Sequence, residues 1–410
     1  MKQQTRSSSC HARLWYSRPT LFKKQNPRCC LENPRSAGWR RPRQHFASGG
    51  WVTMAAVKDR APLRFGIDVG GTKIALGLVS EEGELVTGRA FPTPRSVRAQ
   101  EVLALISGQL RELLGEAGAG LDQVEAVGMG FPGEFDGETG RVLTAPNVPS
   151  FVGLDLCREL QETLRRTPGY DGPVRVGNDA RVAALAEARW GAGTGCRRFL
   201  YLTVSTGVGG AVFESGPSVD EGGPGDAVNI EPGLKTFPDP DRPQECLERL
   251  AGGAALARRA REALRSEIDR GGLQAAVART SLLQPPNPSP EAVRARIEAL
   301  SARDLAAEAE RGDRFSQTLL ELSAELVASS LLQLIRRADD RGAPLERIVV
   351  GGSIALKAPG YLEGLRTSLT GLLRSAKAGG RGAGAELVAS TLGDDRGVLG
   401  ATLLVDTAGF

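Results

Sequence analysis

The chain has 410 residues, of which 41% are hydrophobic and 24% are charged. These values are typical of a soluble globular protein, and the length exceeds what one hydrophobic core usually organises, so we expect two domains. No apolar run approaches the roughly 18 residues of a membrane-spanning helix, which argues against a membrane protein.

Residues 1–53 differ from the rest of the chain in charge. They hold eleven of the 52 Lys and Arg residues but only one of the 48 acidic residues. The remaining chain carries 41 basic and 47 acidic side chains and is therefore mildly acidic. Proteins that bind nucleic acid usually present a basic surface to the phosphates, so we predict no nucleic-acid partner.

This basic leader is rich in Arg and contains Ser, but it lacks the apolar core of a secretory signal. Two interpretations remain open: an organellar transit segment, or an extension that precedes a true start at Met54. Both place residues 1–53 outside the fold. We expect a cytoplasmic protein, or one in a plastid or another organelle if the leader is a genuine transit segment.

Cysteine and histidine are sparse outside the leader. Cys157, Cys196 and Cys246 are far apart and form no CxxC pair, which indicates a reducing compartment. Both histidines, His11 and His45, lie in the leader. Catalysis by histidine and histidine-containing metal sites are therefore excluded from the folded part.

The first structured region begins with three apolar segments that predict strands at residues 64–69, 74–79 and 85–91. The first two are joined by a Gly-Gly turn and read as an antiparallel pair. Residues 97–116 have helical spacing and end in glycines, and residues 124–129 predict a further strand.

A second region repeats this pattern. Residues 181–190 predict a helix, and strands at 199–204 and 211–213 flank another glycine turn. Strand, glycine turn and strand thus occur twice, in separate halves of the chain. Identity between the halves is low, so we suspect a duplication.

The remaining residues are expected to form mainly helices and loops. Residues 216–243 read as a loop, 247–267 as a helix, 285–290 as a proline-rich surface loop, 348–350 as a buried strand and 397–405 as a small-residue helix that packs closely. Asp313 can cap a long amphipathic helix. We expect its buried stripe to contain Leu319, Leu322, Leu326 and Leu334.

The two glycine turns follow strands, and either one alone is explained by a hairpin, since glycine tolerates positive φ. A Walker A loop is excluded because Thr72-Lys73 enters a strand instead of a helix. As a pair, the turns could bind both sides of a nucleotide's phosphates through exposed backbone N–H groups, with hydroxyls from Thr72 and Thr206. Asp68 could hold Mg²⁺ through water, since hard cations prefer oxygen ligands.

Asn178 and Asp179 stand between the two turns, immediately before the predicted helix. Either residue could simply cap that helix. A carboxylate at a helix N-terminus also stays ionised, and an ionised Asp179 could accept the proton of a substrate hydroxyl as its oxygen attacks phosphorus. The two roles are compatible.

Taken together, these segments resemble the ROK family (repressors, open reading frames and sugar kinases). The resemblance extends over about residues 64–410 in an ordered series of matches: residues 68–73, 130–133, 145–149, 178–180 with Glu187, 201–210, 246–248, 348–352, 392–394 and 400–401.

The resemblance implies an α/β protein with the actin-like ATPase fold, a duplicated ribonuclease H-like fold of two domains with a cleft that holds ATP and sugar. Residues 64–178 plus 392–410 would form the small N-terminal domain, and residues 179–391 the large C-terminal domain. The resemblance also implies Asp179 as general base and a homodimer. The implied sugar ligands are Asn147, Asn178 and Glu248, and the implied nucleotide-binding residues are Gly70, Gly71, Thr72, Lys73, Thr206, Gly207, Gly209, Gly351 and Gly352.

The sequence departs from the family's pattern in two places. Members often carry Gly-Glu-x-Gly-His, whose Glu and His touch the sugar, whereas this chain has Asp226 and Asn229 at the ungapped positions. With a short gap, neither has a counterpart. We therefore expect the contact to a sugar hydroxyl to be altered or lost.

The family's zinc site is the second departure. Of its cysteine cluster only Cys246 remains, and a structural tetrahedral site needs four ligands, so we expect no zinc. The leader also lacks the helical periodicity of the helix-turn-helix found in the family's repressors.

The leading hypothesis is an ATP- and Mg²⁺-dependent hexose kinase, with glucose as the first expectation and fructose or an N-acetylhexosamine as alternatives. A non-catalytic sugar or nucleotide sensor is the competing hypothesis, which the altered residues Asp226 and Asn229 motivate.

Overall fold

The computed structural model describes residues 52–53, 61–94, 97–137, 139–215, 226–229, 246–283, 289–377 and 385–407, all within the unit Gln44–Phe410. In strands β1 and β11, defined below, only the side chain of Ala227 is described. The proline-rich segment at residues 285–288 and the segment at residues 230–245 lie outside this description.

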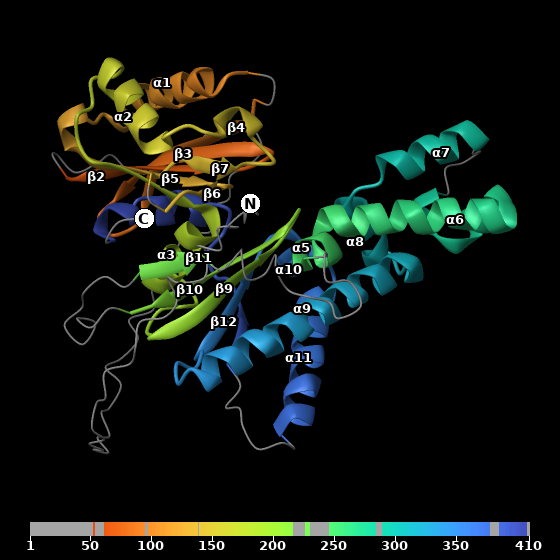
Figure 1. The fold of residues 1–410 in the computed structure, drawn as a ribbon. Helices are drawn as coiled ribbons and strands as arrows, with labels where there is room; N and C mark the ends of the chain where they lie inside the picture. The colour runs from red at the N-terminus through yellow and green to blue at the C-terminus, as the bar shows by residue number, and fades with distance from the viewer. Residues whose placement is uncertain are drawn as a thin grey trace, which may run out of the picture. The chain divides into compact units, whose positions relative to one another are not determined.

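Most described strands belong to two sheets (Figure 1). In spatial order, the first sheet consists of β1 (Val52–Thr53), β4 (Leu85–Pro92), β3 (Lys73–Ser80), β2 (Leu63–Val69), β5 (Val124–Phe131) and β8 (Val174–Asn178). The second consists of β11 (Asp226–Asn229), β10 (Val208–Glu214), β9 (Arg198–Val204), β12 (Arg347–Gly351) and β13 (Glu386–Ala389). A small ribbon joins β6 (Glu134–Phe135) to β7 (Val142–Thr144).

The described helices are α1 (Ala99–Ala117), α2 (Leu156–Arg166), α3 (Asp179–Trp190), α5 (Leu247–Ala251), α6 (Gly253–Arg279), α7 (Pro290–Ala299), α8 (Ala302–Glu310), α9 (Arg314–Asp340), α10 (Ser353–Lys357), α11 (Tyr361–Lys377) and α12 (Arg396–Ala401). Short 3-10 helices are η1 (Leu121–Gln123), η2 (Pro149–Phe151), η4 (Ser281–Leu283) and η5 (Leu404–Asp406).

The two sheets repeat one topology. In the first, β4, β3 and β2 are antiparallel neighbours, and β5 and β8 continue parallel to β2. In the second, β11, β10 and β9 are antiparallel, and β12 and β13 continue parallel to β9. The same strand order and directions in both halves support the suspected duplication. The first sheet has one additional strand, β1. Both residues of β1 belong to the leader, residues 1–53, that we expected to lie outside the fold.

Alternate residues of β2 face opposite sides of the first sheet. Phe65 and Ile67 lie in a core with residues of α1 and α2, which Figure 1 shows on one face of this sheet. Gly66 faces α12 instead, and a Cβ there would lie 2.1 Å from the carbonyl oxygen of Val398. A Cβ on Gly128 of β5 would lie 1.8 Å from the Ala401 carbonyl oxygen. The close packing expected of this small-residue helix is confirmed.

Two predicted elements differ from the structure. The helix expected over residues 247–267 is divided at Gly252 into α5 and α6. Residues 226–229, expected within a loop, form β11 and pair with β10, with Asn229 opposite Ala211. A four-residue strand at a sheet edge produces too little alternation to stand out in a glycine- and proline-rich segment.

The amphipathic helix α9 begins as predicted, since the Asp313 carboxylate accepts a hydrogen bond of 2.8 Å from the Ser316 backbone N–H. The predicted buried stripe lies on a different side of the helix from the observed one. Leu322 is exposed, whereas Leu319, Leu326 and Leu334 are half-buried. The buried stripe consists of Leu320, Ala324, Val327, Leu331 and Ile335. By length and apolar composition α9 could cross a membrane, but this stripe lies in the core of the second half and α9 packs against α11.

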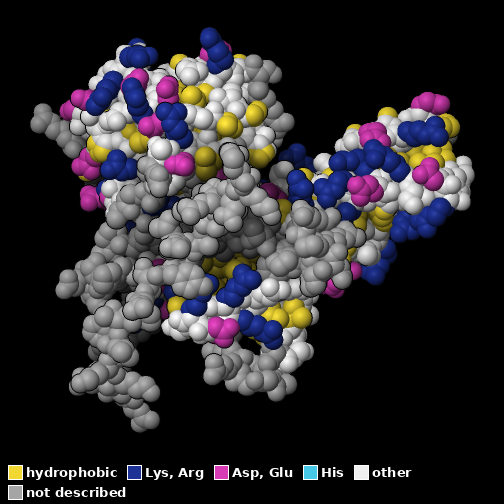
Figure 2. Space-filling view, in the orientation of Figure 1, with side chains coloured by type: hydrophobic (Ala, Val, Ile, Leu, Met, Phe, Trp, Pro, Cys, Tyr) yellow, Lys and Arg dark blue, Asp and Glu magenta, His cyan; other side chains and the backbone are white. Residues whose placement is uncertain are grey.

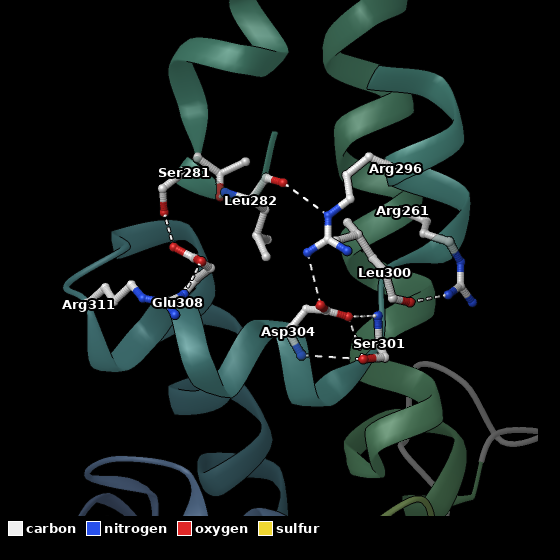
Figure 3. Close-up of polar contacts among 10 residues, drawn as sticks. Arg261, Ser281, Leu282, Arg296, Leu300, Ser301, Asp304, Glu308 and Arg311 are labelled. Carbon is white, nitrogen blue, oxygen red and sulfur yellow. Dashed lines mark hydrogen bonds and ion pairs between the residues drawn. The ribbon is translucent and has the colours of Figure 1, made fainter. Parts of the chain in front are cut away.

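Polar contacts join α6, η4, α7 and α8 (Figure 3). The Arg296 guanidinium donates to the Leu282 carbonyl oxygen at 3.4 Å and to the Asp304 carboxylate at 2.9 Å. Arg261 of α6 donates to the Leu300 carbonyl oxygen at 2.8 Å. These side chains satisfy carbonyl groups where the short helices end, so the helices are fixed to one another around α6.

Basic side chains gather over α6 and α7 on the face shown in Figure 2, with acidic side chains among them. Arg265 pairs with Glu298, and Arg279 lies 3.2 Å from Glu267. Both signs alternate, so this face carries a mixed charge instead of a uniformly basic one.

Candidate functional site

The first glycine turn, residues 70–72, joins β2 to β3. The Gly70 N–H donates to the Lys73 carbonyl oxygen at 2.9 Å, and a Cβ on Gly70 would lie 2.8 Å from the same oxygen. The Thr93 hydroxyl donates to the Gly70 carbonyl oxygen at 2.6 Å. Thr72 is exposed, and Lys73 is the first residue of β3. The backbone and one neighbouring hydroxyl thus define the shape of this turn.

Asp68 precedes this turn in β2 and is half-buried. A Cβ on Gly397 would lie 2.2 Å from its Oδ2, so the carboxylate rests against the backbone of α12. Burial raises the pKa of Asp68, while the positive charges of Arg396 and Lys73 act in the opposite direction. Lys73 also lies 3.8 Å from Asp394. The first turn therefore has charged groups on several sides.

Asn147 lies next to the same turn. A Cβ on Gly71 would lie 2.8 Å from the Asn147 Cγ, so the amide side chain packs directly on the turn backbone. Asn147 is exposed and follows β7. The structure thus brings one predicted sugar ligand to one predicted phosphate turn.

Asn178 ends β8 and caps α3. Its Oδ1 accepts hydrogen bonds from the N–H groups of Ala180 at 2.9 Å and Arg181 at 3.4 Å. Its Nδ2 donates to the Gly133 carbonyl oxygen at 3.2 Å. The predicted cap is confirmed, and both ends of this amide have protein partners. Its role as a sugar ligand stays a prediction.

Asp179 is the first residue of α3 and is half-buried. Its Oδ1 lies 2.8 Å from the Ala180 N–H, which it shares with Asn178. The carboxylate thus lies at a helix N-terminus, where the helix dipole favours negative charge. Asp179 is therefore not enclosed in the hydrophobic core.

Sheet register relates Asp179 to Asp68. Asp68 pairs with Gly130 of β5, and Gly130 pairs with Gly177 of β8, one residue before the capping Asn178. Since neighbouring strands lie about 4.8 Å apart, the backbones of Asp68 and Gly177 are roughly 10 Å apart at the carboxyl ends of parallel strands. The predicted base and the predicted metal ligand therefore share one edge of the first sheet.

The second glycine turn, residues 205–207, joins β9 to β10. The Ser205 N–H donates to the Gly207 carbonyl oxygen at 2.9 Å. The carbonyl oxygens of Ser205 and Thr206 accept from the N–H groups of Gly253 at 2.8 Å and Ala254 at 2.9 Å. The Thr206 side chain is exposed. This turn is thus docked on the first residues of α6 by backbone hydrogen bonds.

Gly209 lies beyond the turn, within β10 and opposite Thr203. It is buried in the sheet and not at the turn itself. Glu248 of α5 does reach the turn, since a Cβ on Gly207 would lie 2.1 Å from its Oε1. Glu248 therefore lies against the second glycine turn, just as Asn147 lies against the first.

Gly351 ends β12, and Gly352 precedes α10 with φ +95°. A Cβ on Gly351 would lie 2.6 Å from the Tyr201 hydroxyl oxygen, and one on Gly352 would lie 2.3 Å from the Val204 carbonyl oxygen. Positive φ and close packing on β9 both require glycine here. These constraints explain the pair without a ligand, and its place in an adenosine pocket stays a prediction.

Comparisons with known proteins agree with this arrangement. A model of the ROK family matches residues 64–408. The chain belongs to the ROK family. Glucokinases from Halalkalibacterium halodurans and Thermotoga maritima are 26% and 27% identical to it, over 83% of this chain and 94% and 96% of their own lengths.

A crystal structure of a ROK family glucokinase from Streptomyces griseus, in complex with glucose and AMPPNP, is 27% identical. It aligns with 84% of this chain and 100% of its own, with a TM-score of 0.60. Similarity over the full lengths of these proteins makes the chain glucokinase-like and confirms the α/β, actin-like ATPase fold.

The structure describes only part of the two regions where the sequence departs from the ROK pattern. Asp226 and Asn229 lie at the ends of β11, and their side chains are outside the description. Cys246 is a half-buried free thiol just before α5. No group of three His, Cys, Asp or Glu side chains that could hold a metal occurs within the described ranges, but these leave out residues 230–245. The expectation of no zinc stays a prediction.

The chain's residues fit Mg²⁺ that arrives with a nucleotide. Mg²⁺ usually keeps several waters and takes one or two carboxylates together with substrate phosphates. Asp68, at the carboxyl end of β2 beside the first turn, offers one such carboxylate. A dedicated protein cage would need more oxygen ligands than this edge of the sheet provides.

Sequence reasoning missed a polar group around Glu187 that includes the buried Tyr201 and the half-buried Arg396 and Ser390. Glu187, which we named only as part of the resemblance, is fully buried and accepts from the Ala192 N–H at 2.7 Å and from the Ser390 hydroxyl. Burial raises its pKa. The signal in the sequence was the charged run 394–396 ahead of a small-residue helix.

Proposed function

We propose that this protein is an ATP-dependent hexose kinase that prefers glucose, with Asp179 as the general base. The support comes from its similarity to two glucokinases along nearly their whole lengths, and from the glucose and AMPPNP bound in the Streptomyces griseus relative. The site residues supply the chemical argument.

The position of Asp179 carries this proposal. Asn178 caps α3, and the Asp179 carboxylate lies beside it at the same helix N-terminus, where negative charge is favoured. Asp179 stands on the same sheet edge as Asp68. An ionised carboxylate there would orient the sugar hydroxyl and accept its proton as the oxygen attacks the γ-phosphorus of ATP.

The other residues would bind and position the reactants. Backbone N–H groups of the two glycine turns would hold the phosphates, and Asn147 and Glu248, which lie against those turns, would bind sugar hydroxyls. Asp68 would hold Mg²⁺ through water, and the bound cation would offset the negative charge of the phosphates.

Replacement of Asp179 tests the proposal. We expect Asp179→Asn to lower kcat by at least about a hundredfold, because the amide cannot accept the proton, while AMPPNP still binds. The exposed Asp171→Asn, on the surface of the same half, is the matched control and should keep normal turnover. Near-normal kcat in Asp179→Asn would remove this residue from the role of base.

Substrate choice is best measured as ADP release over a panel of glucose, fructose, N-acetylglucosamine and N-acetylmannosamine. We expect the highest kcat/KM with glucose. Sugar binding without ADP release from any of them would instead support the sensor hypothesis, for which the substitutions at Asp226 and Asn229 are the specific motive.

We also propose a cytoplasmic homodimer, or an organellar one if residues 1–53 direct import. N-terminal sequencing of the native protein would distinguish a removed transit segment from a start at Met54. Light scattering after size exclusion would measure the oligomeric state.

A further inference from the structure

Two buried hydroxyl groups hold the end of the short helix α5. The Ser323 hydroxyl, on α9, donates to the carbonyl oxygen of Ala251, the last residue of α5, at 2.7 Å. The same hydroxyl oxygen lies 2.8 Å from that of Tyr361, the first residue of α11. All three residues are buried. Three helices that are distant in sequence therefore meet at one chain of hydrogen bonds.

The donors in this chain have a fixed order. A serine hydroxyl carries one proton, and Ser323 gives it to the Ala251 carbonyl, so the Tyr361 hydroxyl must donate to Ser323. Burial raises the pKa of Tyr361 to about 12, so the phenol keeps this proton at neutral pH. The chain of hydrogen bonds is thus directed from Tyr361 through Ser323 to the backbone of α5.

The carbonyl groups of α5 need partners from elsewhere because the helix has only five residues. The last carbonyls of a helix have no partner within it. The Arg249 carbonyl accepts from the guanidinium of the exposed Arg258 at 2.7 Å, and the Ala251 carbonyl accepts from Ser323. A buried carbonyl without a partner is costly, so Ser323 anchors α5 in the core.

Helix α5 also carries Glu248, which is half-buried and proposed above to bind sugar. A Cβ on Gly207 of the second glycine turn would lie 2.1 Å from the Glu248 Oε1. Glu248 precedes Ala251 by three residues, which is less than one helical turn. A shift at the end of α5 therefore displaces Glu248 as well.

We propose that Ser323 and Tyr361 are positioning residues for sugar binding, which set the place of Glu248 by holding the Ala251 carbonyl. This inference deepens the proposed function and rests on it. Both residues act through α5 and not by contact with a reactant. A purely structural role predicts instead that the loss of either hydroxyl lowers stability without a selective loss of sugar affinity.

Ser323→Ala tests the proposal, with Ser330→Ala as the matched control. Ser330 is buried on the same helix, but its hydroxyl donates to the Leu326 carbonyl of α9 itself, at 3.0 Å. We expect Ser323→Ala to weaken glucose binding at least about fivefold, because the Ala251 carbonyl must shift to find another partner. Ser330→Ala should leave glucose binding unchanged.

Calorimetric titration of glucose without nucleotide measures this affinity independently of turnover. AMPPNP affinity should change less than about twofold in Ser323→Ala, since the second turn is held to α6 by backbone hydrogen bonds from Gly253 and Ala254. If another sugar of the panel gives the highest kcat/KM, it replaces glucose in these titrations. Unchanged glucose affinity in Ser323→Ala, or an equal loss of glucose and AMPPNP affinity, would overturn the inference.

Double-mutant cycles distinguish positioning from a general loss of stability. Glu248→Ala should weaken glucose binding at least about tenfold, and Ser323→Ala in that background should weaken it less than about twofold further, because the side chain that Ser323 positions is absent. Tyr361→Phe should weaken glucose binding about two- to fivefold, and should add little to Ser323→Ala or to Glu248→Ala. Additive losses in these cycles would contradict the positioning role. If Ser323→Ala does not fold, the cycle of Tyr361→Phe with Glu248→Ala still decides it.

The wild type and Glu248→Ala separate this inference from the proposed function. Absence of both sugar binding and ADP release by the wild type with every sugar of the panel would contradict the kinase proposal itself. Normal glucose binding by Glu248→Ala would remove Glu248 from the sugar site and overturn the inference with it. Weak binding by Glu248→Ala, together with normal binding by Ser323→Ala and Tyr361→Phe, would contradict only the positioning role.

Discussion

The two glycine turns share a topology but are held in different ways. Each joins the antiparallel strands at the centre of its sheet. The first is surrounded by charged groups, with Asp68 before it and the pair of Lys73 and Asp394 after it. The second is fixed by backbone hydrogen bonds from Gly253 and Ala254 at the start of α6.

This difference suggests a division of work between the halves of a duplicated fold. A turn next to a carboxylate suits the metal-bearing phosphates, where charge must be balanced during transfer. A turn docked on a helix by its own backbone suits rigid binding of the rest of the nucleotide. Substitutions that remove charge should therefore act on the first turn, and substitutions that add a side chain should act on the second.

The largest effect is expected from removing the charge at the first turn. Asp68→Asn should lower kcat with Mg²⁺ and ATP at least about a hundredfold, since the neutral amide holds Mg²⁺ poorly. Stability should change in the other direction. Burial raises the pKa of Asp68 in the folded state, so the wild type is stabilised below the ordinary pKa of about 3.9 and loses that stability as pH rises through the folded pKa.

The Asp68→Asn variant has no carboxyl group to ionise at this position, so it does not lose stability as pH rises. Its melting temperature at pH 8 should therefore equal or exceed that of the wild type. Thermal unfolding from pH 4 to 8, measured beside kcat, checks both parts. A variant that is markedly less stable at pH 8 would show that Asp68 serves the fold and not the reaction.

A smaller effect is expected from crowding the second turn. A Cβ on Gly252 would lie 2.8 Å from the Glu248 carbonyl oxygen, 3.0 Å from that of Thr206 and 3.1 Å from the Cα of Gly207. All three are backbone atoms, so they must shift together. Gly252→Ala should destabilise the protein by about 1–3 kcal/mol and raise the KM for ATP, with less change in the KM for sugar.

Gly364→Ala provides the matched control for this substitution. Gly364 lies inside α11 with no atom within 4 Å of an added Cβ, so alanine there should be neutral or slightly stabilising. Urea unfolding and initial rates would give both quantities. An unchanged KM for ATP in Gly252→Ala would mean that the second turn does not bind the nucleotide.

Local patterns predicted the frame of both turns. Apolar strand segments around paired glycines indicated the hairpins, and an Asn before a helical segment indicated the cap that Asn178 forms. Asp313 was predicted to cap α9 for the same reason. These features depend on residues a few positions apart, which a sequence displays directly.

Long-range packing could not be predicted in this way. The buried face of α9 was misplaced because leucines occur on both sides of the helix, and contacts with α5, α6, α8 and α11 decide which are covered. The group around Arg396 depends on Asp68, Glu187 and Tyr201, which come from separate parts of the chain. The charged run at residues 394–396 indicates polar surroundings, but nothing near Arg396 indicates which distant residues provide them.

The smallest effect is expected from the exposed ion pair of the first turn. Lys73 and Asp394 are 3.8 Å apart with nearly half of each side chain exposed, so solvent screens their attraction. Asp394→Asn should change the free energy of unfolding by less than about 0.5 kcal/mol, and added salt should remove even that difference.

Glu214→Gln, which removes the ion pair with Arg198 on the second hairpin, should change the free energy of unfolding by a similarly small amount. Urea unfolding at low and high salt measures both. A loss above about 1.5 kcal/mol in Asp394→Asn alone would show that this pair, and not the backbone hydrogen bond at Gly70, holds the first turn in shape.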